Sequence, residues 1–207
     1  MQQILAVLVL LTAGASPALA QNAPSASLRG FGGVSFMSET GGAFGGGLGL
    51  RVSDRFEVIG EIGRLTNMLP RQIQRDLDEA ARAMRPFYGD GLTIDGRAPA
   101  VYGFGGLRAS RQAGTRLTMF ADAGAGMARG TSDIRARAGG RDVSADVRSA
   151  LRIKAAETRA LIALGGGVIL PLTDRSGLEL GYRYMRVFTD DPRINTGTMS
   201  AAFRWGL

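Results

Sequence analysis

Hydrophobic and polar residues alternate along this chain in runs of about ten residues, and turn-forming residues separate the runs. The last run shows the pattern most clearly. Its apolar face carries Met199, Ala201, Phe203, Trp205 and Leu207, and its other face carries Thr198, Ser200, Arg204 and Gly206. A period of two residues is typical of a strand with one apolar and one polar environment. We therefore expect a strand at 198–207.

Seven further runs follow the same pattern. They cover 28–36, 43–52, 56–65, 99–108, 116–129, 161–170 and 178–188. Tight connections at 53–55, 109–115 and 172–177 alternate with long ones at 66–98 and 130–157 and shorter ones at 37–41 and 189–194. Eight strands with this alternation predict an all-β fold, an eight-stranded antiparallel up-and-down transmembrane β-barrel with tight periplasmic turns.

The first long loop has a helical period of its own. Pro70 precedes an apolar stripe of Ile73, Leu77, Ala80, Ala81 and Met84, and Pro86 follows as the expected stop. We predict a short helix over 71–84. Its Ala-rich stripe favours a lid packed on the barrel mouth, and the alternative is a helix lying on the outer leaflet or contacting a partner.

Composition removes most enzymatic chemistry. The chain has no Cys and no His, so it can form neither a disulfide framework nor a thiolate metal site, and it lacks the commonest general base. The glycine runs 45–47, 105–106 and 165–167 lie inside alternating strands and not before helices, so they are poor phosphate loops. We expect them to relieve crowding in a narrow barrel. The prediction is no catalytic residue, no cofactor and no metal.

Charged residues collect on the face assigned to the lumen. They are Arg51, Glu57, Glu61, Asp122, Glu179, Arg183 and Arg204. A catalytic carboxylate pair is one interpretation. In an eight-stranded barrel, however, side chains just fill the interior, so we favour a structural ion network.

The chain is basic, with a net charge of +7 and a pI near 10.9. The region 129–154 contains Arg129, Arg135, Arg137, Arg141, Arg148, Arg152 and Lys154. Alternation around Gly139-Gly140 predicts two strands that meet in a hairpin beyond the membrane. The region is either a solvated surface or a partner for lipid phosphates. No recognised motif or interleaved aromatic residue supports nucleic-acid binding.

The N-terminus has the features of an export signal. An apolar run at 4–13, Pro17 and the small residues Ala18 and Ala20 precede Gln21, which predicts a signal peptide over 1–20 and a barrel domain over 21–207. No later stretch has the roughly 18 apolar residues of a transmembrane helix. The predicted location is the outer membrane of a Gram-negative cell.

Several stretches resemble the small outer-membrane β-barrel family, which includes the OmpA transmembrane domain, OmpX-like proteins and opacity-type, porin-like adhesins. They are 31–36 (FGGVSF), 121–126 (ADAGAG), 171–175 (PLTDR), 181–184 (GYRY) and 203–207 (FRWGL). The resemblance implies a terminal insertion signal at Phe203, Trp205 and Leu207, read by the barrel-insertion machinery. Family members typically end in an aromatic residue, whereas this chain ends in Leu207.

These observations favour a structural or surface-interaction (adhesin-like) barrel with a plugged, charged lumen. Its expected partners are outer-membrane lipid, lipopolysaccharide and an extracellular partner of the outer loops, and a monomer is favoured. The alternatives are a small transporter or channel, a hydrophobic-ligand-binding barrel, a soluble lipocalin-like barrel, and a lipid-acting enzyme, for which the chain lacks the histidine. We therefore expect that it is not an enzyme.

Overall fold

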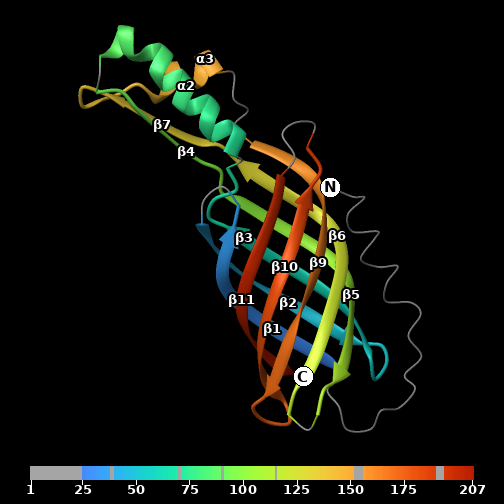
Figure 1. Ribbon diagram of the computed structural model, residues 1–207. Helices are drawn as coiled ribbons and strands as arrows, with labels where there is room; N and C mark the ends of the chain where they lie inside the picture. Colours follow the sequence, from blue (N-terminus) through green and yellow to red (C-terminus); the bar gives the residue numbers. More distant parts are fainter. Residues whose placement is uncertain are drawn as a thin grey trace.

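The computed structural model describes residues 25–37, 40–69, 71–89, 91–114, 116–151, 156–189 and 194–207. Eight strands close into an antiparallel barrel (Figure 1), which confirms the predicted architecture. The barrel strands are β1 (Ala26–Phe36), β2 (Thr40–Arg51), β3 (Phe56–Leu65), β5 (Ala100–Gln112), β6 (Thr118–Thr131), β9 (Ala156–Pro171), β10 (Ser176–Val187) and β11 (Ile194–Gly206). Each pairs with its neighbours along the chain, and β1 pairs with both β2 and β11. The signal-peptide prediction lies outside the described residues.

The register fixes the tilt of the strands. Register partners on adjacent strands can be followed once around the barrel from Ala26, through 50, 58, 107, 123, 164, 184 and 197, to Phe36 on the same strand. The offset from residue 26 to residue 36 is ten residues. With a rise of about 3.3 Å per residue and a strand spacing of about 4.7 Å, this offset tilts the strands by about 40° from the barrel axis.

The alternation of the sequence becomes the wall of the barrel. The exposed outer face carries large apolar side chains from every barrel strand, among them Leu28, Leu48, Ile62, Leu107 and Met119. Near the end of β11, Phe203 and Trp205 lie on the same outer face with ring centroids 6.3 Å apart. A continuous apolar exterior is the surface that a barrel needs in order to face lipid chains.

The two long loops fold together beyond one end of the barrel, and we call this unit the appendage (Figure 1). It consists of α2 (Arg71–Tyr88), α3 (Ser144–Leu151) and a three-stranded sheet of β4 (Thr93–Arg97), β7 (Asp133–Ala138) and β8 (Arg141–Asp142). The tight turns and Leu207 lie at the opposite end. No helix in the described part of the chain is long and apolar enough to cross a membrane.

The appendage corrects two expectations about helix α2. Pro86 does not stop the helix, which continues to Tyr88. A proline in the last turn costs one backbone hydrogen bond, and Tyr88 extends the apolar stripe into the appendage core. Gly89 ends the helix with a φ of 82°, and its N–H donates to the Arg85 carbonyl at 2.8 Å. The helix is also not a lid on the lumen, because its apolar side packs against β4 and β7.

The predicted hairpin around Gly139-Gly140 forms only in part. Both glycines have positive φ, 54° and 83°, as a tight two-residue hairpin turn requires. The second strand, however, is only two residues long, and α3 replaces the rest of it. The Asp142 carboxylate accepts the backbone N–H of Ser144 at 2.9 Å, which satisfies a donor of the first helical turn. The helix then turns Val147 into the core, where it is fully buried.

Candidate functional site

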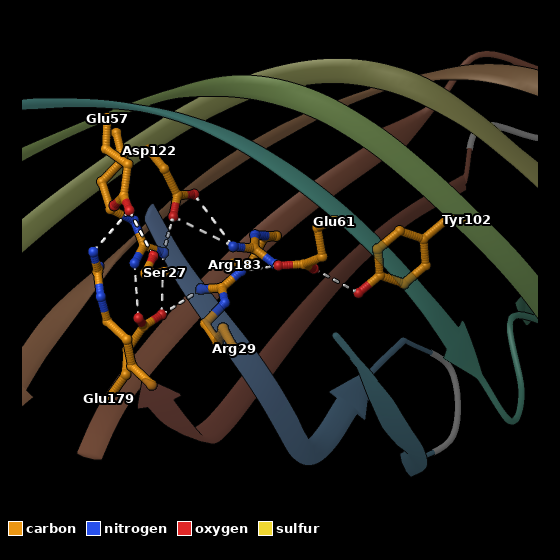
Figure 2. Close-up of polar contacts among 10 residues, drawn as sticks. Ser27, Arg29, Glu57, Glu61, Tyr102, Asp122, Glu179 and Arg183 are labelled. Atoms are coloured by element: carbon orange, nitrogen blue, oxygen red, sulfur yellow. Dashed lines mark hydrogen bonds and ion pairs between the residues drawn. The ribbon is translucent and has the colours of Figure 1, made fainter. Parts of the chain in front are cut away.

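The barrel encloses six charged side chains that form one closed ring (Figure 2). They come from five strands and all occupy inward-facing positions: Arg29 on β1, Glu61 on β3, Arg108 on β5, Asp122 on β6, and Glu179 and Arg183 on β10. The order of ion pairs around the ring is Glu179, Arg29, Glu61, Arg183, Asp122, Arg108 and back to Glu179. We call it the ionic ring.

Every member of the ionic ring contacts two partners of opposite charge. Arg108 places Nη2 2.8 Å from Asp122 Oδ2 and Nη1 2.7 Å from Glu179 Oε2. Arg183 Nη2 lies 3.3 Å from Asp122 Oδ2 and its Nη1 pairs with Glu61. Arg29 bridges Glu61 and Glu179. Three positive and three negative groups therefore cancel, which is what a buried cluster of charges requires.

Neutral groups and a further ion pair flank the ring on both sides. On one side the Tyr102 hydroxyl donates to Glu61 Oε1 at 3.0 Å. On the other side Arg204 Nη2 lies 2.7 Å from Glu57 Oε1, which also accepts a hydrogen bond of 2.8 Å from Ser27 Oγ. The contacts of Glu57 with Arg204 and Ser27 extend the polar network toward the end with the tight turns, whereas Tyr102 lies on the side of the appendage.

Aromatic rings and glycines shape the space around the charges. The Arg108 guanidinium lies 4.0 Å from the centroid of the Phe120 ring, and a cation over an aromatic face is stabilised by the ring quadrupole. A Cβ added to Gly165 would collide with the Asp122 carboxylate, and one added to Gly49 would collide with that of Glu57. These glycines therefore make room for carboxylates, as expected for a crowded barrel.

Each ring carboxylate pairs with two guanidinium groups. Such pairing stabilises the ionised form of a carboxylate and holds its side chain in place. Among the described residues, no group of three or more His, Cys, Asp or Glu side chains is arranged to hold a metal ion.

The structure brings together six of the seven lumen residues singled out in the sequence. Arg51 is the exception and is corrected here, because it lies exposed at the mouth near the tight turns, where β2 ends. The sequence interpretation missed Arg29, Arg108, Tyr102 and Ser27. The alternation along β5 could have identified Arg108. It lies on the same side of the strand as Tyr102 and Phe104, and Val101 and Leu107 lie on the other side.

Between the ring and the appendage the lumen is lined by apolar side chains. A buried cluster there includes Leu65, Met68, Tyr102, Leu161, Met185 and Val187. The sequence predicts a charged lumen and does not predict this apolar part. The interior therefore has two parts, one ionic and one apolar.

The arginines of 129–154 are spread over different surfaces. Arg129 faces outward on β6, whereas Arg135 and Arg137 lie on the exposed face of the appendage sheet. Arg135 Nη2 is 3.3 Å from Asp133 Oδ2 in an exposed pair. The side chain of Arg148, and residues 152 and 154 altogether, are outside the described part of the structure.

A closed antiparallel barrel with an apolar outer wall and a charged interior defines the class of small transmembrane β-barrels. No protein-family model matches the chain, and no curated protein matches it.

Solved structures of similar fold do exist. The crystal structure of Neisserial surface protein A is similar with a TM-score of 0.55 and 13% identity, over 88% of this chain and 96% of that chain. A major outer membrane protein from Thermus thermophilus is similar with a TM-score of 0.52 and 14% identity, over 87% of this chain and 99% of that chain. The fold of this chain is that of the small outer-membrane β-barrels, which confirms the resemblance seen in the sequence at the level of the fold.

Proposed function

We propose that this protein is a surface-interaction barrel of the outer membrane, in which the barrel holds the appendage outside the cell. The observation that carries the proposal is the hydrophobic core of the appendage. Ile73, Leu77 and Met84 of α2 pack with Ile94 of β4, Ile134 and Ala136 of β7 and Val147 of α3. Long loops with a shared core form a folded unit with a defined surface, which is what recognition of a partner needs.

The remaining surface of the appendage supports a role in polar recognition. The sheet face turned away from α2 carries Asp95 opposite Arg135 and Arg97 opposite Asp133. These side chains are exposed and alternate in sign. An exposed polar face of this kind is suited to an extracellular macromolecule, in contrast to an apolar pocket for a small lipid.

The lumen argues for a plugged barrel and against the transporter and channel alternatives. The ionic ring crosses the interior, and the apolar cluster fills the part between it and the appendage. An ion crossing this interior would have to break paired buried charges and then pass apolar side chains, and both steps are costly.

The barrel wall offers a place for the lipid phosphates among the expected partners. Arg64 and Arg129 face outward near the appendage end, on either side of Val101 in the register of β3, β5 and β6. Two strand spacings put these arginines about 10 Å apart. Arginine pairs well with phosphate, so we infer that lipopolysaccharide contacts the wall here.

The test replaces 69–97 and 132–155 with short Gly-Ser linkers and compares adhesion of cells that display either form. We expect both forms to migrate faster unheated than boiled on an SDS gel, and only the full protein to promote attachment to extracellular-matrix or host-cell surfaces. Reconstituted in planar bilayers, the full protein should carry no steady current. Equal adhesion by the two forms would refute the appendage as the interacting unit, and a steady current would revive the channel.

A further inference from the structure

The end of the barrel opposite the appendage contains a cavity that the proposed function does not use. Its volume is about 700 Å³, within the usual range of roughly 300–1,000 Å³ for small-molecule sites. Ser27, Glu57 and Arg204 lie at its inner end, next to the ionic ring. The tight turns and strand ends form its rim, so it is a blind cup that opens along the barrel axis.

Two turns of the rim repeat one motif. Ser53-Asp54-Arg55 joins β2 to β3, and Thr173-Asp174-Arg175 joins β9 to β10. In the first turn Ser53 Oγ accepts the backbone N–H groups of Arg55 and Phe56, and in the second Thr173 Oγ1 accepts those of Arg175 and Ser176. Both turns therefore bring an arginine to the lining of the cup in the same local conformation.

Neighbouring strands hold these arginines in place. The Arg55 carbonyl accepts the Ser110 N–H at 2.8 Å, and the Arg175 carbonyl accepts the Gly206 N–H at 2.6 Å. Arg51 is tied in the same way, because its N–H donates to the Ser25 carbonyl at 2.9 Å. The backbone of three rim arginines is thus fixed before any ligand arrives, which lowers the entropy that binding would cost.

The charges that line the cup are unbalanced. Five arginines (Arg51, Arg55, Arg111, Arg175 and Arg204) face three carboxylates (Asp54, Glu57 and Asp174). Glu57 and Arg204 neutralise each other. Among the residues that the structure describes, no ion pair engages Arg51, Arg55, Arg111 or Arg175. Four exposed guanidinium groups therefore surround the cup with only two carboxylates to offset them.

We propose that this cup binds a small phosphate-bearing anion from the periplasmic side, with Arg55 and Arg175 as its paired ligands. The planar guanidinium donates two parallel hydrogen bonds to a phosphate. The two turns lie four strands apart, on opposite sides of the cup, so an anion with two phosphate groups presents one group to each arginine. Lipid headgroups offer the same phosphate chemistry. The cup opens along the axis, away from the surrounding lipid, which favours a soluble anion.

The experiment titrates inorganic pyrophosphate into the full protein in phosphatidylcholine nanodiscs and follows the heat of binding at low salt. The test variant is Arg55→Gln with Arg175→Gln. The matched control is Arg135→Gln with Arg137→Gln, which removes the same charge from the appendage. Both variants are first shown to shift in mobility on heating like the unaltered protein.

We expect saturable binding with one site per barrel and a loss of at least about tenfold in affinity in the rim variant alone. No saturable heat, or an equal loss in both variants, would overturn the proposal. A second arm replaces part of the phosphatidylcholine by phosphatidylglycerol. Unchanged pyrophosphate binding supports a soluble ligand, whereas abolished binding would make lipid the occupant and overturn the soluble source.

Discussion

At the scale of single residues, Arg108 decides how the lumen is held together. It is the largest fully buried side chain of the barrel, with 1% of its surface exposed. A guanidinium can be buried there because Asp122 accepts a hydrogen bond from Nη2 and Glu179 accepts hydrogen bonds from both terminal nitrogens. Removing it would leave two buried carboxylates with one cation fewer between them.

We expect Arg108→Met to destabilise the barrel by about 3–5 kcal/mol, because the two carboxylates lose a shared partner. Urea unfolding in phospholipid vesicles measures the change. Arg111→Met is the control, since Arg111 is exposed near the end of the same strand and enters no ion pair among the described residues. Equal unfolding midpoints for the two variants would show that the ring contributes no more than a surface charge.

The ring shows what alternation can and cannot reveal about single residues. Six charged residues could be assigned to the lumen because each lies on the polar face of a strand whose other face is apolar. They are Glu57, Glu61, Asp122, Glu179, Arg183 and Arg204. Arg29 was missed because Phe31 shares its inward face of β1 and makes that face mixed, although the opposite face is apolar throughout. Arg51 was misassigned because its parity is inward but its strand ends there.

At the scale of elements, the appendage depends on α2 docking on its sheet. Leu77 is 1% exposed, and a Cβ added to Gly96 of β4 would collide with its side chain. The helix can approach the strand closely because position 96 of β4 has no side chain, which leaves room for Leu77 of α2. No described strand of the barrel takes part in this contact.

Leu77→Ala should open the appendage and leave the barrel intact. Truncating a buried leucine costs about 2–5 kcal/mol, and a unit with so small a core has little stability to lose. Limited proteolysis of outer membranes should cut the variant within 67–98 or 132–155, while its mobility shift on heating persists. Phe87→Ala is the control, because Phe87 is 85% exposed. Equal resistance of both variants to protease would contradict the shared core.

The helix and the hairpin could each be predicted from local sequence, but their union could not. Helical spacing indicated α2, and the paired glycines indicated the turn at 139–140. The common core joins segments separated by the strands β5 and β6, and no local period reports on such a distant contact. The strand predicted beyond Asp142 became α3, because apolar residues at 143, 145 and 147 fit a strand while the Asp142–Ser144 contact favours a helix start.

At the scale of the whole molecule, arginines lie at both ends of the barrel but on different surfaces. Arg64 and Arg129 face the surrounding membrane near the appendage, whereas Arg51 and Arg111 line the cup at the other end. An outer membrane presents lipopolysaccharide phosphates only on its outer side. The position of an arginine along the axis should therefore determine whether it contacts them.

Arg64→Gln with Arg129→Gln should lower the amount of lipopolysaccharide that purifies with the barrel in mild detergent by severalfold, because two phosphate partners are lost. Arg51→Gln with Arg111→Gln removes the same charge at the other end and should have no effect. The measurement is lipopolysaccharide per mole of protein. An equal decrease in both variants would indicate a response to net charge and not to position.

The ionic ring also sets a condition on how the molecule is assembled. Arg29 belongs to β1, whereas Glu179 and Arg183 belong to β10. The ring can therefore form only after β11 has paired with β1. An open sheet would have Arg108 and Asp122 already side by side, with Arg29 lacking Glu179 across the seam. Closure of the barrel and neutralisation of its interior are thus a single event, and a stalled, unclosed sheet would expose charges that the finished protein hides.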